Sequence, residues 1–249
     1  MSDTYCYWSV CDGPYGAMME NCVRTARAAG VFKEFHVLCD RALEGCHCYD
    51  AFQFDKAGGL FKLHYLNVGA SRLPFDFLVW VDADSVFLRN PRDLLGAMGR
   101  SPLHVPLEYD LSALRDDRIW KSVSCLKLRD SFQRAGVMNR PYLSGSAFWI
   151  IKREAIDQVY NLALQFWNGR VELGLRLNVD AALGYAMQML CGNPEAHVIA
   201  KRPDLWASTC HRESGQGVPS GSSWEWKHPV ATDPVLVRPA IVHVPKGRS

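Results

Sequence analysis

The chain has 249 residues and a nearly balanced charge, and these totals narrow the classes of protein to consider. Apolar residues make up 48% and charged residues 22%, which is the composition of a globular chain with one large or two small domains. A formal charge of +2 creates no basic field, so composition gives no reason to expect nucleic-acid binding.

The cysteines and the apolar runs bear on the cellular compartment. Nine cysteines without regular spacing, in a chain too large to need disulfides, favour reduced thiols. Cys46-His47-Cys48 is interpreted as part of a loop, because a structural zinc site needs four ligands and no second pair follows at finger-like spacing. No apolar run approaches the ~20 residues that span a bilayer, and no signal-peptide core is present. We expect a cytoplasmic protein without a transmembrane segment; peripheral membrane attachment and a longer parent chain are left open.

The first part of the chain alternates strand and helix patterns. Residues 4–10 predict an aromatic and β-branched strand, and typical turn residues follow it at 11–16. A helix is expected to reach about Ala29, with Gly30 as its stop. The next expected elements are a strand at 34–38, an irregular loop at 39–56, a helix from about 59 and a strand at 77–81. This order predicts a doubly wound, mostly parallel sheet.

The strand at 77–81 is the centre of the prediction. Its five residues, Phe-Leu-Val-Trp-Val, are all apolar, so it should be buried on both faces. It runs directly into Asp82-Ala83-Asp84, and side chains at positions i and i+2 of an extended chain point the same way. Two carboxylates held together repel unless a cation lies between them. At the carboxyl end of a buried strand, where open α/β sheets bind ligands, a divalent metal ion meets this need.

Three interpretations of this Asp-X-Asp motif compete. The aspartates could end the strand in a solvated turn or cap the next helix. With Ser85 and Val86 they also fit a phosphatase pattern, but that class normally has this strand near its start and a later acidic pair, which we do not find. The third interpretation is the Asp-X-Asp of nucleotide-sugar glycosyltransferases, which holds Mn²⁺ or Mg²⁺ against a diphosphate. Because many apolar strands end in this motif, the rest of the chain must decide.

The second part of the chain contains two strong helix patterns among shorter elements. Residues 153–167 carry apolar side chains at helical spacing and end before Gly169, and Asn178 can cap a further helix. The charged block 107–141 is expected to be an insertion over the sheet edge, mainly solvated, and the Gly/Ser-rich block 214–224 a mobile loop. The remaining expected elements are a helix at 93–98 and strands at 103–106, 147–151 and 240–244. We find no linker or repeat, so residues 1–249 are predicted to form one domain.

Several separated stretches resemble one family, the glycogenin-like retaining glycosyltransferases. Lys62-Leu63-His64, followed by the strand that ends in Asp82 and Asp84, is similar to the Lys-Leu-His helix and Asp-Ala-Asp strand of that family. The order and approximate spacing of the matching stretches hold across nearly the whole chain. The other matching residues are Asp12 and Tyr15 after the first strand, Ser144-Gly145 before the strand at 147–151, Asp180 at a helix start, and His243 with Lys246-Gly247 near the end.

The resemblance implies a single GT-A (Rossmann-like) domain, with a central, mostly parallel mixed sheet flanked by helices. It implies that Asp82, Asp84 and His243 bind Mn²⁺ or Mg²⁺, and that Asp180 lies beneath the anomeric carbon as the catalytic residue. The residues that it implies for nucleotide and donor binding are Asp12, Tyr15, Lys62, Asp82, Ala83, Asp84, Ser144, Gly145, Lys246 and Gly247.

From the residues alone, other roles stay open for several of these positions. Asp12 could be an Asx-turn residue, Tyr15 a half-buried turn aromatic and Lys62 a solvated lysine. Asp180 is favourable at a helix start simply through the helix dipole. The chain also departs from the family pattern at positions that concern the sugar. Leu143 stands where an asparagine is expected, Ala181 replaces a glutamine, and Lys246 follows its histidine by three residues rather than six.

The sequence therefore predicts a metal-dependent glycosyltransferase. It would move a hexose from a UDP-sugar to a hydroxyl group of a carbohydrate or other acceptor, with retention of the anomeric configuration. A sugar nucleotidyltransferase would need a Gly-rich basic loop after the first strand, and 11–16 is not one. A catalytically silent binding or scaffold module with the same fold is the alternative from another class. The sugar, the acceptor, the linkage and the oligomeric state are not specified.

Overall fold

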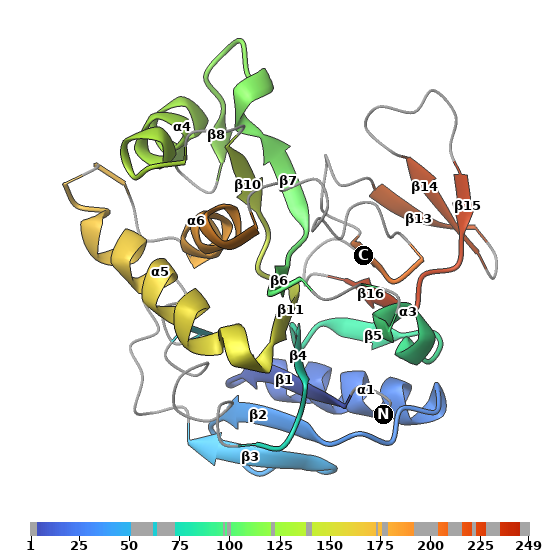
Figure 1. Ribbon diagram of the computed structural model, residues 1–249. Coiled ribbons are helices and arrows are strands. Elements are labelled where there is room, and N and C mark those ends of the chain that lie inside the picture. The colour runs from blue at the N-terminus through green and yellow to red at the C-terminus, as the bar shows by residue number, and fades with distance from the viewer. Residues whose placement is uncertain are drawn as a thin grey trace.

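The fold is a mixed α/β arrangement around one six-stranded sheet (Figure 1). The computed structural model describes residues 4–50, 62–63, 73–96, 98, 101–120, 123–137, 141–172, 174–175, 179–191, 204–208, 216–220, 223–227 and 235–244. The strand order is β3-β2-β1-β4-β11-β6. These strands are β1 (Tyr5–Cys11), β2 (Phe35–Cys39), β3 (Cys46–Asp50), β4 (Phe77–Val81), β6 (Leu103–His104) and β11 (Phe148–Lys152).

The strand directions confirm the predicted mixed, mostly parallel sheet. β1 pairs in parallel with both β2 and β4, and β2 pairs in parallel with β3. β11 is antiparallel to β4 and to β6. Because β1 and β4 are parallel neighbours, their carboxyl ends meet at one edge, and the residues that follow Cys11 and Val81 lie beside each other.

Helices lie on both sides of this sheet (Figure 1). The helices are α1 (Tyr15–Ala28), α3 (Arg92–Gly96), α4 (Cys125–Arg134), α5 (Ile156–Gly169) and α6 (Val179–Cys191), with short 3₁₀ helices η3 (Leu111–Ala113) and η4 (Arg153–Ala155). α1 buries Met19, Cys22 and Ala26 at helical spacing and ends at Gly30, whose φ of 79° is open to glycine at little cost. The expected α1, α3, α5 and α6 are confirmed within a few residues.

Strand β4 shows why five apolar residues follow one another. All five of its residues are buried. Leu78 and Trp80 join the core that contains α5 and α6, whereas Phe77, Val79 and Val81 join the core that contains α1. Each fully buried side chain of this size stabilises folding by about 1.5–3 kcal/mol. The strand that carries the Asp-X-Asp motif is therefore one of the most firmly held segments of the molecule.

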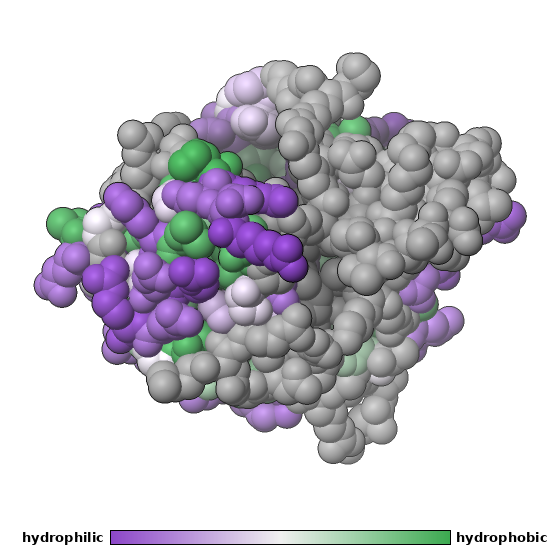
Figure 2. Space-filling view, turned by 90° about the horizontal axis from the view of Figure 1, so that it is seen from above, coloured by the Kyte–Doolittle hydropathy of each residue, from purple (hydrophilic) through white to green (hydrophobic). Residues whose placement is uncertain are grey.

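The block 107–141 is more ordered than predicted. It forms η3, α4 and the strands β7 (Leu107–Asp110), β8 (Ile119–Trp120) and β9 (Val123–Ser124), and β7 pairs with β10 (Tyr142–Ser144). Trp120, Leu128 and Phe132 are buried in the same core as α5 and α6, so the expectation of a mainly solvated face is wrong for these residues. Seen from above, the described surface on the left of the view is mainly hydrophilic, with smaller apolar areas between the hydrophilic side chains (Figure 2).

The C-terminal part adds two small sheets. β5 (Ser85–Phe87), β12 (Trp206–Ser208) and β16 (Ile241–His243) form one of them, in the order β12-β16-β5. β13 (Gln216–Ser220), β14 (Ser223–Lys227) and β15 (Val235–Val237) form the other. The strand expected at 240–244 is confirmed as β16. The block 214–224 was expected to be a loop, and this is wrong because β13 and β14 pair along its described residues.

Two further expectations concern residues 39–64. Cys46-His47-Cys48 lies in β3 and not in a loop, because it pairs in register with residues 35–37 of β2. Most of the helix expected from about 59 lies outside the described residues, although Lys62 and Leu63 are helical. The eight cysteines of the described part are all free, as expected. None of the helices in that part has the length and apolar character to cross a bilayer.

Candidate metal centre

Asp82, Asp84 and His243 form one cluster. One ligand atom from each residue lies within 4.8 Å of the other two, and this is the only group of its kind among the described residues. Strand pairing explains the convergence: β5 begins directly after Asp84 and runs antiparallel to β16, so that Ser85 faces His243. The amide of Val244 also donates to the carbonyl oxygen of Asp84, at 3.0 Å. The structure thus brings together the three predicted ligands from distant parts of the chain.

Two cationic or polar groups hold the carboxylate of Asp82. Lys62 Nζ lies 2.8 Å from its Oδ1, and the indole Nε1 of Trp80 donates to the same oxygen at 3.0 Å. Lys62 Nζ also donates to the carbonyl oxygen of Ser146, at 3.3 Å. The backbone amide of Asp82 is fixed to the neighbouring strand by a hydrogen bond to the carbonyl oxygen of Ala147, at 3.0 Å. One carboxylate oxygen is therefore committed to Lys62 and Trp80.

The electrostatic balance keeps Asp82 ionised. Burial alone would raise the pKa of this carboxyl, but the charges of Lys62 and His243, with the hydrogen bonds from Lys62 and Trp80, outweigh it and lower the pKa. A site that keeps a half-buried aspartate negatively charged is suited to binding a cation.

His243 is fixed at both ring nitrogens. Its Nε2 lies 3.2 Å from Oδ1 of Asp84, and its Nδ1 lies 3.0 Å from Oγ of Ser208 on the neighbouring strand β12. Only 6% of His243 is exposed. Two carboxylates and one imidazole are a donor set that suits Mn²⁺ and tolerates Mg²⁺, with room for oxygen ligands from a substrate or water.

Asp12 and Tyr15 lie at the carboxyl end of β1, beside the end of β4. The carbonyl oxygen of Asp12 accepts from the amide of Tyr15 at 3.0 Å, and Gly13 between them has a positive φ of 49°. The carboxylate of Asp40 accepts from the Gly13 amide at 2.9 Å, which anchors the turn to β2. The Tyr15 side chain is 40% exposed. An exposed aromatic side chain at the first residue of α1, directly after an anchored turn, is a suitable surface for stacking a planar ring.

Ser144 and Asp180 are joined where α6 meets β10. Ser144 Oγ donates to the carbonyl oxygen of Asp180 at 3.1 Å, and both residues are buried. A Cβ at Gly184 would lie 3.0 Å from Ser144 Oγ and 3.3 Å from the carbonyl oxygen of Tyr142, so a larger residue would require a small shift of these neighbours. The side-chain amide of Gln188 also bonds to the backbone amide and carbonyl of Tyr142. Asp180 therefore stands on a helix that is held firmly against β10.

The chain between these residues links them to the cluster of Asp82, Asp84 and His243. Gly145 donates to the carbonyl oxygen of Pro106 at 3.0 Å, and Ser146, the next residue, accepts from Lys62, which contacts Asp82. Ala83, between the two aspartates, is only 4% exposed. Lys246 and Gly247 lie outside the described residues.

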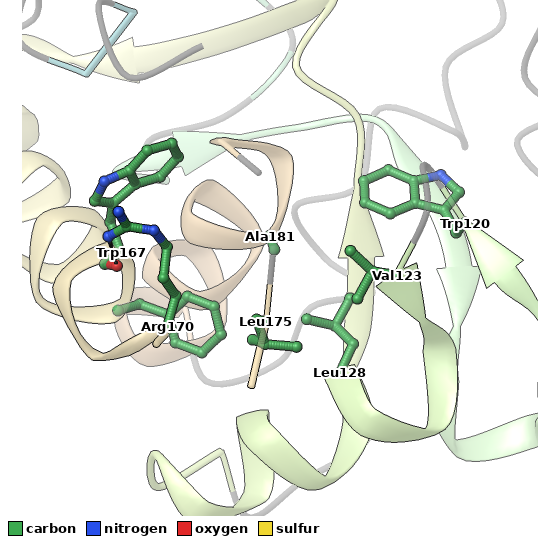
Figure 3. Close-up of a pocket in the computed structure, with 8 residues that line it drawn as sticks. Trp120, Val123, Leu128, Trp167, Arg170, Leu175 and Ala181 are labelled. Carbon is green, nitrogen blue, oxygen red and sulfur yellow. Dashed lines mark hydrogen bonds between the residues drawn. The ribbon is translucent and has the colours of Figure 1, made fainter. Parts of the chain in front are cut away.

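A narrow apolar pocket lies between α4, α5 and α6 (Figure 3). Trp120, Val123 and Leu128 line one side of it, and Trp167 with Arg170 lines the other. The guanidinium of Arg170 lies 4.7 Å from the ring centre of Trp167. The cavity of about 10 Å³ has room for about one water molecule, so a larger molecule could enter only if these side chains moved.

Sequence reasoning missed three residues of the site. Trp80 donates to the carboxylate of Asp82, and Ser146 accepts from the ammonium of Lys62. Ser208 contacts His243. Trp80 had a local signal, because it lies two positions before Asp82 and both side chains share one face of an extended chain. The contact of Ser208 depends on the register between β12 and β16, which no local pattern reveals.

Comparisons with known proteins show no family for this chain: no protein-family model matches it, and neither does any curated protein.

Proposed function

We propose that the protein is a metal-dependent glycosyltransferase with a GT-A fold. It transfers a hexose from a UDP-sugar to a hydroxyl group of an acceptor, with retention of the anomeric configuration. The observation that carries this proposal is the convergence of Asp82, Asp84 and His243 at the carboxyl end of β4. The six-stranded mixed sheet and the motifs that resemble the glycogenin-like family support it.

The donor set fits a hard divalent ion, since it offers carboxylate oxygens and one imidazole nitrogen. When bound, such an ion stabilises the negative charge that develops on the diphosphate as the glycosidic bond breaks. Asp84 directly precedes β5 and His243 is the last residue of β16, so the two paired strands bring their ligand atoms together. Asp82 offers its second oxygen, because Lys62 and Trp80 hold the first.

Lys62 places a positive charge beside Asp82, next to the proposed diphosphate position. Its ammonium is held by Asp82 and Ser146, and 12% of its side chain is exposed. A lysine in this position adds a fixed positive charge where phosphate oxygens would bind. Asp12 and Tyr15, at the end of the adjacent strand, hold the uracil base by hydrogen bonding and stacking.

Asp180 stabilises the developing positive charge of the sugar ring. In a retaining reaction the acceptor enters on the face that the diphosphate leaves, so the departing phosphate oxygen can take the acceptor proton. The chain then has no need of a general base on the opposite face. What it must supply is an anionic or polar group beneath the ring, positioned in advance. Asp180 is buried at the first turn of α6 and held through its backbone by Ser144, which meets the need for a fixed group.

A histidine as third ligand favours this function over a phosphatase, which uses a second acidic pair. A silent scaffold would bind the nucleotide and metal but would not turn over the donor. A donor screen with hydrolysis of the UDP-sugar as the readout, with Mn²⁺ and with EDTA, separates the enzyme from the scaffold.

Calorimetric titration of UDP tests the metal bridge directly. UDP should bind tightly with Mn²⁺ and weakly with EDTA, because both the carboxylates and the diphosphate are negatively charged. Equal affinities under the two conditions would refute a metal-bridged diphosphate.

A further inference from the structure

We infer that Ser208 is a positioning residue for His243, which it keeps in the tautomer needed for metal binding. This inference rests on the proposed function of the same site. The hydroxyl Oγ of Ser208 lies 3.0 Å from Nδ1 of His243, and Ser208 is fully buried. Neighbouring strands hold the two residues in place, because β12 and β16 pair in parallel with Ser208 directly opposite His243.

The tautomer of His243 decides whether it can be a ligand. Nε2 points to Asp84 at 3.2 Å, so this nitrogen is the one that faces the cluster. A neutral imidazole carries its proton on one nitrogen only, and a metal binds the nitrogen that lacks it. For Nε2 to bind a metal, the proton must therefore be on Nδ1, where Ser208 Oγ is available to accept it.

A hydroxyl suits this position because it both donates and accepts. When Nε2–H donates to Asp84, the Ser208 hydroxyl can donate to Nδ1. When Nε2 becomes a ligand, Nδ1–H can donate to Ser208 Oγ. The buried Nδ1 keeps a partner in both states, so the change of tautomer leaves no buried nitrogen unsatisfied. Partners of this kind orient metal-binding histidines and raise their basicity.

A second serine provides a matched comparison within the same three-stranded sheet. Ser85 faces His243 from the other side, on β5, and is 1% exposed. Among the residues that the structure describes, its hydroxyl has no hydrogen-bond partner. The row Ser208, His243, Ser85 thus contains two buried serines next to one histidine, of which only Ser208 bonds to the ring. Removing the hydroxyl of Ser208 breaks the hydrogen bond to His243, whereas removing the hydroxyl of Ser85 only alters a buried serine. A comparison of the two variants therefore isolates the effect of the hydrogen bond.

The decisive experiment compares Ser208→Thr with Ser208→Val. These two side chains have nearly the same shape and differ in one hydroxyl, so a steric disturbance affects both. Binding of Mn²⁺ alone is measured by the electron paramagnetic resonance signal of the free ion, without any assay of activity. We expect Ser208→Val to bind Mn²⁺ about 10–100-fold more weakly than Ser208→Thr, the usual cost of losing such a partner. Ser85→Ala should retain the wild-type affinity.

A spectroscopic readout reports the tautomer itself. Long-range ¹H–¹⁵N spectra of the Mg²⁺-loaded protein, with His243 assigned by comparison with His243→Gln, should show the proton on Nδ1 in wild type and Ser208→Thr. Equal Mn²⁺ affinities of the Thr and Val variants would overturn the role of Ser208 and leave the proposed function standing. Absence of Mn²⁺ binding in the wild type, with and without UDP, would instead overturn the metal centre.

Discussion

Two clusters that contain titratable side chains lie at the central sheet, and their surroundings have opposite effects on ionisation. One keeps an aspartate charged, and the other keeps a histidine neutral. At the metal centre, Asp82 stays ionised because Lys62 and His243 offset its burial. In the second cluster, which we name the histidine stack, Trp8, His36, His47 and Tyr49 pack ring against ring across β1, β2 and β3. Burial there lowers the pKa of His36 to about 4, so this imidazole is neutral at physiological pH.

The first cluster keeps a carboxylate ionised and is the proposed metal site, whereas the second is a stack of aromatic and imidazole rings. His36 lies 4.8 Å from the ring centre of Trp8 and 5.0 Å from that of His47, and its Nδ1 lies 2.8 Å from the hydroxyl of Tyr49. Nδ1 therefore has its partner within the stack, and Nε2 lies 3.8 Å from a carboxylate oxygen of Glu34. The carboxylates at the metal centre instead converge on a shared position. Titratable groups with perturbed pKa values occur in both clusters, so the direction of the shift and the countercharges matter more than the shift itself.

The largest expected effect is at the metal centre. Asp84→Ala should abolish turnover and reduce the UDP affinity measured with Mn²⁺ to that measured with EDTA. Loss of a partner behind a ligand already costs about 10–100-fold in metal affinity, and loss of the ligand itself should cost more. Asp93→Ala, which removes an exposed carboxylate from α3, is the control for a general change of charge. If UDP binding by Asp84→Ala still depended on Mn²⁺, Asp84 would not be a metal ligand, and the proposed contrast between the two clusters would fail.

The next effect concerns Asp180. Asp180→Asn should lower kcat by at least ~100-fold, comparable to the loss of one preorganised electrostatic contact, while the UDP affinity barely changes. The split between kcat and binding is the expected sign of an interaction made mainly in the transition state.

Proton NMR of the product tests the stereochemistry that underlies this prediction. The anomeric configuration of the donor should be preserved. An inverted product would reject retention, and the search for a general base would then move to Glu108 and Asp110.

A smaller effect is expected at the base-binding edge. Tyr15→Ala should weaken UDP binding by ~1–3 kcal/mol, the range for one aromatic stack on a base. Phe32→Ala is a matched control, because Phe32 is 80% exposed and precedes β2 at the opposite end of the sheet. Both variants are measured by calorimetry with Mn²⁺. If the two affinities agree with that of the wild type, Tyr15 is a turn residue only.

The extent to which sequence predicted the molecule follows from the range of each interaction. β4, α5 and α6 could be predicted because their apolar patterns are local and long. The strands β5, β10 and β12 have only three residues each, and they form because partners distant in sequence pair with them.

The residues of the candidate site also differ in how far local sequence predicts them. Asp82 and Asp84 follow a local motif, whereas His243 required a family resemblance. The contact of Ser208 follows from a strand register that sequence alone does not supply. Apolar residues of the 107–141 block were hidden among charges, so its burial against α5 and α6 was not anticipated.

The smallest effect, on stability, tests the histidine stack. The folded pKa of His36, about 4, lies below its ordinary value of 6.5, because burial and His47 outweigh the attraction of Glu34. Between these pH values His36 is protonated in the unfolded chain but remains neutral in the folded chain. The stabilisation is therefore complete above pH 6.5 and is lost as pH falls toward 4. Aspartates with lowered pKa values, such as Asp76 and Asp82, add their losses mainly below about pH 5, as the unfolded chain takes up protons around the ordinary value of 3.8.

Urea unfolding at intervals from pH 7.5 to 4.5 isolates the contribution of His36. The wild-type free energy of unfolding should fall steadily below pH 6.5. His36→Gln, which cannot take up a proton, should be less stable at neutral pH but show a flatter dependence. His47→Gln removes the charge beside His36 but not its burial, which is the larger cause of the lowered pKa, so the pH dependence of stability should persist in this variant. Parallel pH curves for wild type and His36→Gln would mean that His36 titrates alike in both states, and the contrast between a charge-holding site and a neutral stack would then disappear.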